Sequence, residues 1–143
     1  MMALNKNYKP VEALENDEIF RNGIFEWNIT KIIQYINHNK SDICISKTDV
    51  TKHYRLECSF SNINQDHVNS VDISIPVIQA EMNPGKYLTI DGHHRLGKAF
   101  NDGIRYIDSY KLNVNQHIQF FTSVKSYTSF VEYWNSKVRD QRE

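Results

Sequence analysis

The sequence predicts a small mixed α+β domain, and three patterns carry that prediction. Isoleucines within residues 29–36 recur at the i, i+3, i+4 and i+7 spacing of an amphipathic helix. Apolar and polar residues alternate within 54–60 and again within 104–114, which is typical of half-buried strands. Between them, residues 89–103 change from a strand pattern through a glycine to a helix pattern. Interleaved helices and strands favour an α+β fold, with a small mixed sheet and flanking helices.

The helix at 29–36 follows Asn28, a residue type whose side chain caps the first backbone N–H groups of a helix. In the alternating stretch 54–60, Cys58 falls on the apolar side and Glu57 on the polar side. We therefore predict a strand there, with Cys58 inside and Glu57 facing solvent.

Residues 73–80 are rich in β-branched side chains and predict a strand. Pro76 cannot donate to a sheet ladder, so the strand lies at an edge or starts at this proline. The residues at 83–86 are typical of a tight turn, which makes a hairpin with a strand at 87–90. A closing helix is predicted whose apolar face comprises Tyr127, Phe130, Val131, Trp134 and Val138.

Composition sets the class of protein. The 143 residues are 40% hydrophobic, so we expect one undivided domain over 1–143. Lysine plus arginine equals aspartate plus glutamate at 17 each, which leaves no overall positive charge with which to bind nucleic acid. Direct DNA binding without a partner is not expected. No apolar run is long enough for a membrane span and no signal peptide is recognisable, so we expect a cytoplasmic protein.

The cysteines and scattered histidines offer little chemistry by their spacing. Cys44 and Cys58 form no C-x-x-C pair and are expected to be buried free thiols. The four histidines outside the polar segment show no metal-ligand spacing, and we expect them in loops or at the surface. They are His38, His53, His67 and His117.

The polar segment TIDGHHRLGKAFNDG predicts a strand, a tight turn and a helix. Leu96, Ala99 and Phe100 are spaced for one helix face, and residues 101–103 supply a stop. Asp91 stands where an N-cap residue is expected. A glycine after a strand and an aspartate before a helix also occur in many folds for structural reasons alone.

The same turn has the chemistry of an anion site. Amides of Gly92, His93 and His94 would lie at the positive end of the helix dipole, where phosphate or carboxylate binds. Arg95 and Lys98 add cationic donors, and Gly92 has no side chain to block a ligand. Adjacent histidines point about 100° apart on a helix, so no metal site made of protein ligands is predicted.

The stretch YLTIDGHHRLGKAFNDGIRYIDSYKLN, residues 87–113, resembles the core of the ParB/sulfiredoxin-like domain family. In that family a strand ends in a D-G-x-H-R or G-x-x-R turn and enters a helix, and DISIPVI at 72–78 is similar to the preceding strand. The resemblance implies that Gly92, His93, His94 and Arg95 bind nucleotide phosphates, with Asp91 beside them.

Family members include sulfiredoxins, CTP-hydrolysing partition proteins and an ADP-dependent serine kinase. Sulfiredoxins carry a cysteine where this chain has His93, so sulfinic-acid repair is not expected here. Partition proteins carry a G-E-R-R-type turn and a helix-turn-helix domain downstream, for which the 30 residues after Asn113 are too few. In the kinase-like members a turn aspartate lies near the transferred phosphoryl group, a role open to Asp91.

The sequence thus favours binding of a nucleotide (CTP, ATP or ADP) with Mg2+, or of another phosphate-bearing ligand. The reaction expected of it is phosphoryl transfer or nucleotide hydrolysis, with Asp91 and His93 in catalytic roles. A non-catalytic ParB-like module of a DNA-associated, partition or regulatory complex, acting as a ligand-dependent homodimer, stays open. So does a ParB-like nuclease, which the zero net charge and the missing carboxylate cluster disfavour.

Overall fold

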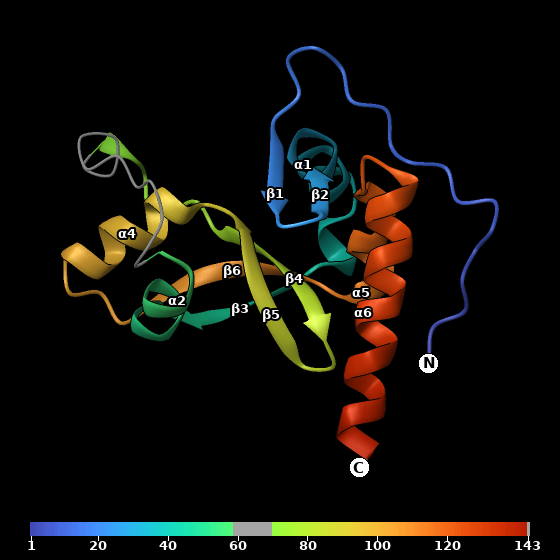
Figure 1. Ribbon diagram of the computed structural model, residues 1–143. Coiled ribbons are helices and arrows are strands. Elements are labelled where there is room, and N and C mark those ends of the chain that lie inside the picture. The colour runs from blue at the N-terminus through green and yellow to red at the C-terminus, as the bar shows by residue number, and fades with distance from the viewer. Residues whose placement is uncertain (59–69, 143) are drawn as a thin grey trace. The chain divides into compact units, whose positions relative to one another are not determined.

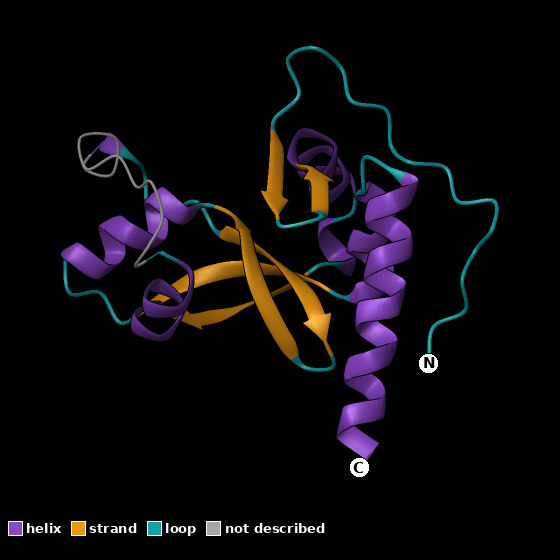
Figure 2. Cartoon of the chain, viewed as in Figure 1, coloured by secondary structure: helices purple, strands orange, loops and turns teal. Residues whose placement is uncertain are grey.

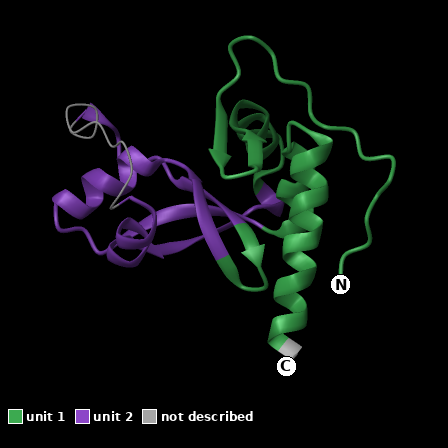
Figure 3. Cartoon of the chain, viewed as in Figure 1, with its two compact units in different colours: residues 1–40, 81–86, 113–143 green, residues 41–80, 87–112 purple. Residues whose placement is uncertain are grey.

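The structure is a computed structural model that describes residues 1–58 and 70–142 (Figure 1). It is a mixed α+β structure with a two-stranded and a four-stranded sheet, so the predicted fold class is confirmed at that level (Figure 2). The chain forms two compact units (Figure 3). Unit 1 comprises residues 1–40, 81–86 and 113–143, and unit 2 comprises 41–80 and 87–112. One undivided domain remains a prediction.

The four-stranded sheet is the framework of unit 2, and its strand order is β3-β6-β4-β5. The strands are β3 (Cys44–Asp49), β4 (Val77–Asn83), β5 (Lys86–Asp91) and β6 (Tyr106–Leu112). β6 pairs antiparallel with β3 and parallel with β4, so the sheet is mixed as predicted. The β4–β5 connection turns at Gly85, whose φ of 76° is the left-handed conformation expected for glycine in a tight turn.

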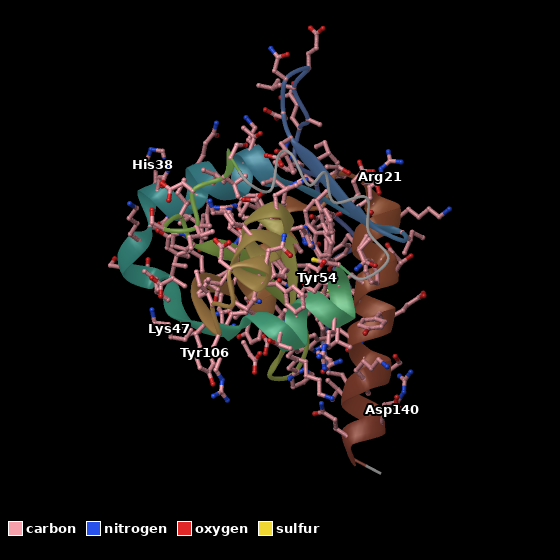
Figure 4. All side chains as sticks on the ribbon, turned by 90° about the vertical axis from the view of Figure 1, so that its left-hand side faces the viewer. Arg21, His38, Lys47, Tyr54, Tyr106 and Asp140 are labelled. Atoms are coloured by element: carbon pink, nitrogen blue, oxygen red, sulfur yellow. The ribbon has the colours of Figure 1, made fainter. Side chains whose placement is uncertain are left out.

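Two helices complete unit 2, and their apolar sides share one core. They are α2 (Val50–Glu57) and α4 (His93–Asn101), which contact one another. Tyr54 of α2, labelled in Figure 4, stacks on Phe100 of α4 with ring centroids 4.0 Å apart. The buried residues of this core are Val50, Cys58, Val77, Leu96, Ala99 and Ile107.

The predicted strand at 54–60 is wrong over its described part. Residues up to Glu57 belong to helix α2, which Asp49 caps by accepting a hydrogen bond from the Lys52 amide. Tyr54 and Cys58 lie four residues apart, a spacing that fits one helix face as well as alternate strand positions. The alternation therefore placed Tyr54 and Cys58 correctly on the inner side but assigned the wrong backbone, and Leu56, which the strand would also turn inward, is 74% exposed on the helix. Residues 59–60 lie outside the described part.

Unit 1 contains a hairpin and several helices. The strands β1 (Ile19–Asn22) and β2 (Phe25–Asn28) pair antiparallel. The helical segments are α1 (Ile29–His38), η1 (Lys40–Asp42) at the boundary with unit 2, α5 (Val114–His117), η2 (Ile118–Phe120) and α6 (Val124–Arg142). The Asn28 side chain accepts a hydrogen bond from the Lys31 amide, which confirms the predicted cap of α1. No helix of the described residues is long and apolar enough to span a bilayer.

His117 is fully buried in unit 1, so its predicted surface location is wrong. The Trp27 indole N–H donates to His117 Nδ1 at 3.1 Å, and His117 Nε2–H donates to the Glu81 carbonyl at 2.7 Å. Both ring nitrogens are thus paired in the neutral tautomer that carries its proton on Nε2. Burial lowers the pKa of His117 to about 4. A single histidine at the end of a short polar helix belongs to no sequence pattern that predicts a buried, doubly hydrogen-bonded imidazole.

The two cysteines differ from expectation in part. Both are free thiols, as predicted, but Cys44 is exposed whereas Cys58 is buried. Cys44 occupies the first position of β3, which is an edge strand of the sheet that the described residues form. Burial raises the pKa of Cys58 to about 12, which keeps this thiol protonated and inert as a nucleophile.

We predict that His117 makes unit 1 sensitive to acid. Its folded pKa of about 4 lies below the ordinary 6.5, so the unfolded chain binds the proton more tightly, and stability falls as pH drops from 6.5 towards 4. The loss is on the order of 3 kcal/mol. Denaturant unfolding at several pH values measures it. His117→Phe should flatten this pH dependence, whereas exposed His38→Phe should leave it intact; an unchanged slope in His117→Phe would contradict the assignment.

Candidate functional site

The turn at residues 91–95 lies between strand β5 and helix α4, as the sequence predicts. β5 ends at Asp91, Gly92 has a φ of 100°, and α4 begins at His93. The first i to i−4 bond of the helix runs from the Leu96 amide to the Gly92 carbonyl at 3.0 Å. Gly92, not Asp91, is therefore the N-cap residue, and it has no side chain with which to cap the helix. The predicted capping role of Asp91 is wrong.

Arg95 hydrogen-bonds both to the turn and to backbone carbonyls that precede β4. Its Nη2 donates to Asp91 Oδ2 at 2.9 Å, and its Nη1 donates to the carbonyls of Pro76 at 3.0 Å and Ile75 at 3.3 Å. The Arg95 and Asp91 side chains are 13% and 16% exposed. A shielded ion pair with additional hydrogen bonds is geometrically fixed, so Arg95 joins the end of β5 to the start of β4.

Other side chains of the protein occupy the position that a side chain at Gly92 would fill. A Cβ built on Gly92 would lie 2.7 Å from Val77 Cγ1 and 2.8 Å from Arg95 Nη2. No real Cβ tolerates such distances, and the positive φ disfavours any other residue as well. Packing of Arg95 and Val77 therefore explains the glycine without a ligand.

His93 is the first residue of α4 and faces an acidic residue of α2. His93 Nε2 lies 4.0 Å from Glu57 Oε1, and the Glu57 carboxylate is only 7% exposed. Burial lowers the pKa of His93, although Glu57 and Asp91 act in the opposite direction. The imidazole is therefore neutral at neutral pH and able to accept a proton.

Glu57 organises more than His93. Its Oε1 accepts the Thr89 amide at 3.0 Å, and its Oε2 pairs with Nδ1 of His53. A carboxylate that holds one ring nitrogen of a histidine fixes the orientation of the other nitrogen, as in hydrolase triads. The sequence predicts neither residue at the site, because the supposed strand puts Glu57 outside and His53 has no ligand spacing.

Lys98 adds positive charge near the turn, and His94 adds an imidazole beside it. Both side chains are partly buried, and His94 lies close enough to His93 for their charges to interact. The pKa of exposed Asp72 is lowered by hydrogen bonds from Ser74 and, less strongly, by Lys98 and Arg95. Lys98 and Arg95 therefore share an electrostatic neighbourhood, as their spacing of three on one helix predicts.

A second polar feature crosses the sheet of unit 2. We call it the polar row, and it comprises four buried side chains, one from each strand: Thr48, Ser109, Gln79 and Thr89. Thr48 Oγ1 lies 2.8 Å from Ser109 Oγ and 3.1 Å from Gln79 Oε1, while Gln79 Nε2 donates to Thr89 Oγ1 at 3.2 Å. The sequence analysis missed this row, although a glutamine inside the apolar run 77–80 could have drawn attention to it.

The described residues contain no group of three or more His, Cys, Asp or Glu side chains able to hold a metal ion. A magnesium ion would therefore depend on phosphate oxygens and water for most of its ligands. Asp91 is the carboxylate at the turn, and its Oδ2 already accepts from Arg95. Asp91 could thus supply one oxygen ligand, which suits a metal that arrives with a nucleotide.

Comparison of the chain with protein-family models, with curated protein sequences and with solved structures gives no match. The geometry of unit 2 therefore stands by itself as the basis for assigning a function.

We predict that Gly92→Ala is strongly destabilising. The new methyl group would collide with Val77 and Arg95 in a left-handed conformation, at a cost of more than about 2 kcal/mol. Gly103→Ala is the matched control at the other end of α4, because it has a φ of 71° but no atom within 4 Å of the added Cβ. Denaturant unfolding should show a much smaller loss for Gly103→Ala. Equal losses would mean that Arg95 does not pack over Gly92.

Proposed function

We propose that the turn at residues 91–95 binds a nucleotide, or another phosphate-bearing ligand, in a ParB/sulfiredoxin-like domain. The observation that carries the proposal is the left-handed glycine turn that starts helix α4 at the end of β5 and is held by the Arg95–Asp91 pair. Backbone amides and the helix dipole at such an end favour a negative group. The resemblance of 87–113 to the family supports the same ligand class.

Cationic side chains add to the attraction. Lys98 is one turn into the helix, and His94 is in its first turn. Arg95 contributes its charge while its hydrogen bonds keep the turn in place. Because phosphate is bound mainly through preorganised donors and positive charge, a rigid turn of this kind loses little entropy when it binds.

The chemistry proposed is phosphoryl transfer or nucleotide hydrolysis. His93 is the better candidate base of the two predicted catalytic residues, since its imidazole is neutral and lies 4.0 Å from the Glu57 carboxylate. Asp91 has one oxygen engaged by Arg95 and fits better as a Mg2+ ligand. Mg2+ would neutralise charge on the phosphates; the protein would hold them in line for attack.

A second candidate is a non-catalytic nucleotide-binding module that dimerises or engages a DNA-bound partner. One observation favours it: Asp91 and Arg95 are paired with each other, as expected of structural residues rather than of reactive ones. The nuclease alternative lacks support, because the described residues provide no multi-carboxylate metal group.

We predict that one of CTP, ATP, ADP and GTP, added with Mg2+, raises the melting temperature of the protein by several degrees. Lys98→Ala and His94→Ala should each reduce that shift, because the first removes a positive charge and the second removes an imidazole hydrogen-bonding group near the turn, without breaking the Arg95 contacts. Lys125→Ala, an exposed change on α6, is the control and should keep the full shift. Each variant is compared with its own ligand-free melting temperature, so a change in stability does not imitate a loss of binding.

The outcomes separate the candidates. Release of phosphate at a steady rate, lost in His93→Gln, would support the enzyme. A shift with ligand-dependent dimerisation and no release would support the module. If no nucleotide shifts the wild-type protein, nucleotide binding at this turn is rejected.

A further inference from the structure

Lys111 extends the polar row on strand β6. Its ammonium pairs with Gln79 Oε1, lies 3.3 Å from Thr48 Oγ1 and stands 4.9 Å from the centroid of the Tyr87 ring. Its side chain is partly buried, and burial lowers its pKa. The positive charge is thus held by a neutral amide, a hydroxyl and an aromatic face.

No carboxylate of the described chain lies within 4.0 Å of the Lys111 ammonium. Lys47 of β3, by contrast, forms an ion pair with Asp108 at 2.6 Å, and its side chain is largely exposed (Figure 4). Cys44 and Glu57 both act to raise the pKa of Lys111, but Cys44 is a thiol and the Glu57 oxygens are engaged by His53 and the Thr89 amide. Removing an ammonium from water without an opposite charge is costly, so the arrangement favours a negative group from outside.

Hydrogen bonding next to the polar row also favours a bound ligand. Ser46 precedes Thr48 by two residues on β3, so both lie on one face of the sheet. Its buried hydroxyl has no hydrogen-bond partner among the described residues. Leaving a buried hydroxyl unsatisfied is unfavourable, and a bound acceptor would remove that cost.

We propose that the sheet face around Lys111 is a second anion site, at which the Lys111 ammonium binds a carboxylate or phosphate oxygen of a small ligand. Hydroxyls of the polar row would surround that oxygen. Tyr87 would limit its approach from the β5 side. The site is distinct from the 91–95 turn: Tyr87 and Asp91 are four residues apart on one strand, about 13 Å. Either proposal can therefore fail without the other.

The test is a titration followed by correlated 1H–15N NMR of the lysine ammonium groups. The probes are sodium phosphate and sodium acetate, with sodium chloride at matched ionic strength as the reference. The Lys111 resonance is assigned by its loss in Lys111→Met. We expect a saturable shift of that resonance with phosphate, with acetate or with both, and the stronger response identifies the anion that the site prefers.

Gln79→Glu makes the test decisive, because it places a carboxylate of nearly the same size beside Lys111. This variant should bind the anion at least about tenfold more weakly, since its own oxygen replaces it. Lys47→Met, on the opposite face of the sheet, should bind normally. The proposal is overturned if neither anion shifts Lys111 saturably, or if Gln79→Glu retains the wild-type affinity.

Discussion

The arrangement of unit 2 depends on the guanidinium of Arg95. It binds Asp91 at the end of β5 and the carbonyls of Ile75 and Pro76 before β4, and it lies where a side chain at position 92 would be. One planar group thus fixes the end of β5, the start of α4 and the segment that leads into β4. The five rigid donors of arginine suit this task, whereas a lysine could not bridge all of these acceptors.

A sheet could be built with an apolar row in place of Thr48, Gln79, Thr89 and Ser109, and apolar packing there would be less demanding. The chain instead places polar side chains from all four strands in hydrogen-bonding contact. The row reaches Glu57 through Thr89, whose amide binds that carboxylate and whose hydroxyl accepts from Gln79. Glu57 in turn faces His93 at the turn. Polar groups that are buried and mutually oriented are typical of ligand sites, where preorganisation lowers the cost of binding.

The sequence predicted best where local chemistry decides the structure. Gly92 and the apolar spacing of Leu96 and Ala99 are local signals, and they predict the turn and helix α4 from a short stretch of sequence. Predictions failed where tertiary pairing decides. Glu57 belongs to a short helix whose apolar positions also fit a strand, and Lys111 meets Gln79 only through the register of β6 and β4. Register between strands distant in sequence leaves no periodic pattern, so the sequence could mark Gln79 as unusual but could not show which side chains it contacts.

The proposed phosphate site lies at the start of helix α4. The most direct measurement follows the backbone amides of Gly92, His93 and His94 by NMR while Mg2+ and the nucleotide are added to the labelled protein. Phosphate binding at this turn predicts saturable chemical-shift changes that are largest at these three amides and extend along α4 to Lys98. Saturable binding whose largest shifts fall elsewhere, or no binding by any nucleotide or by inorganic phosphate, would contradict it.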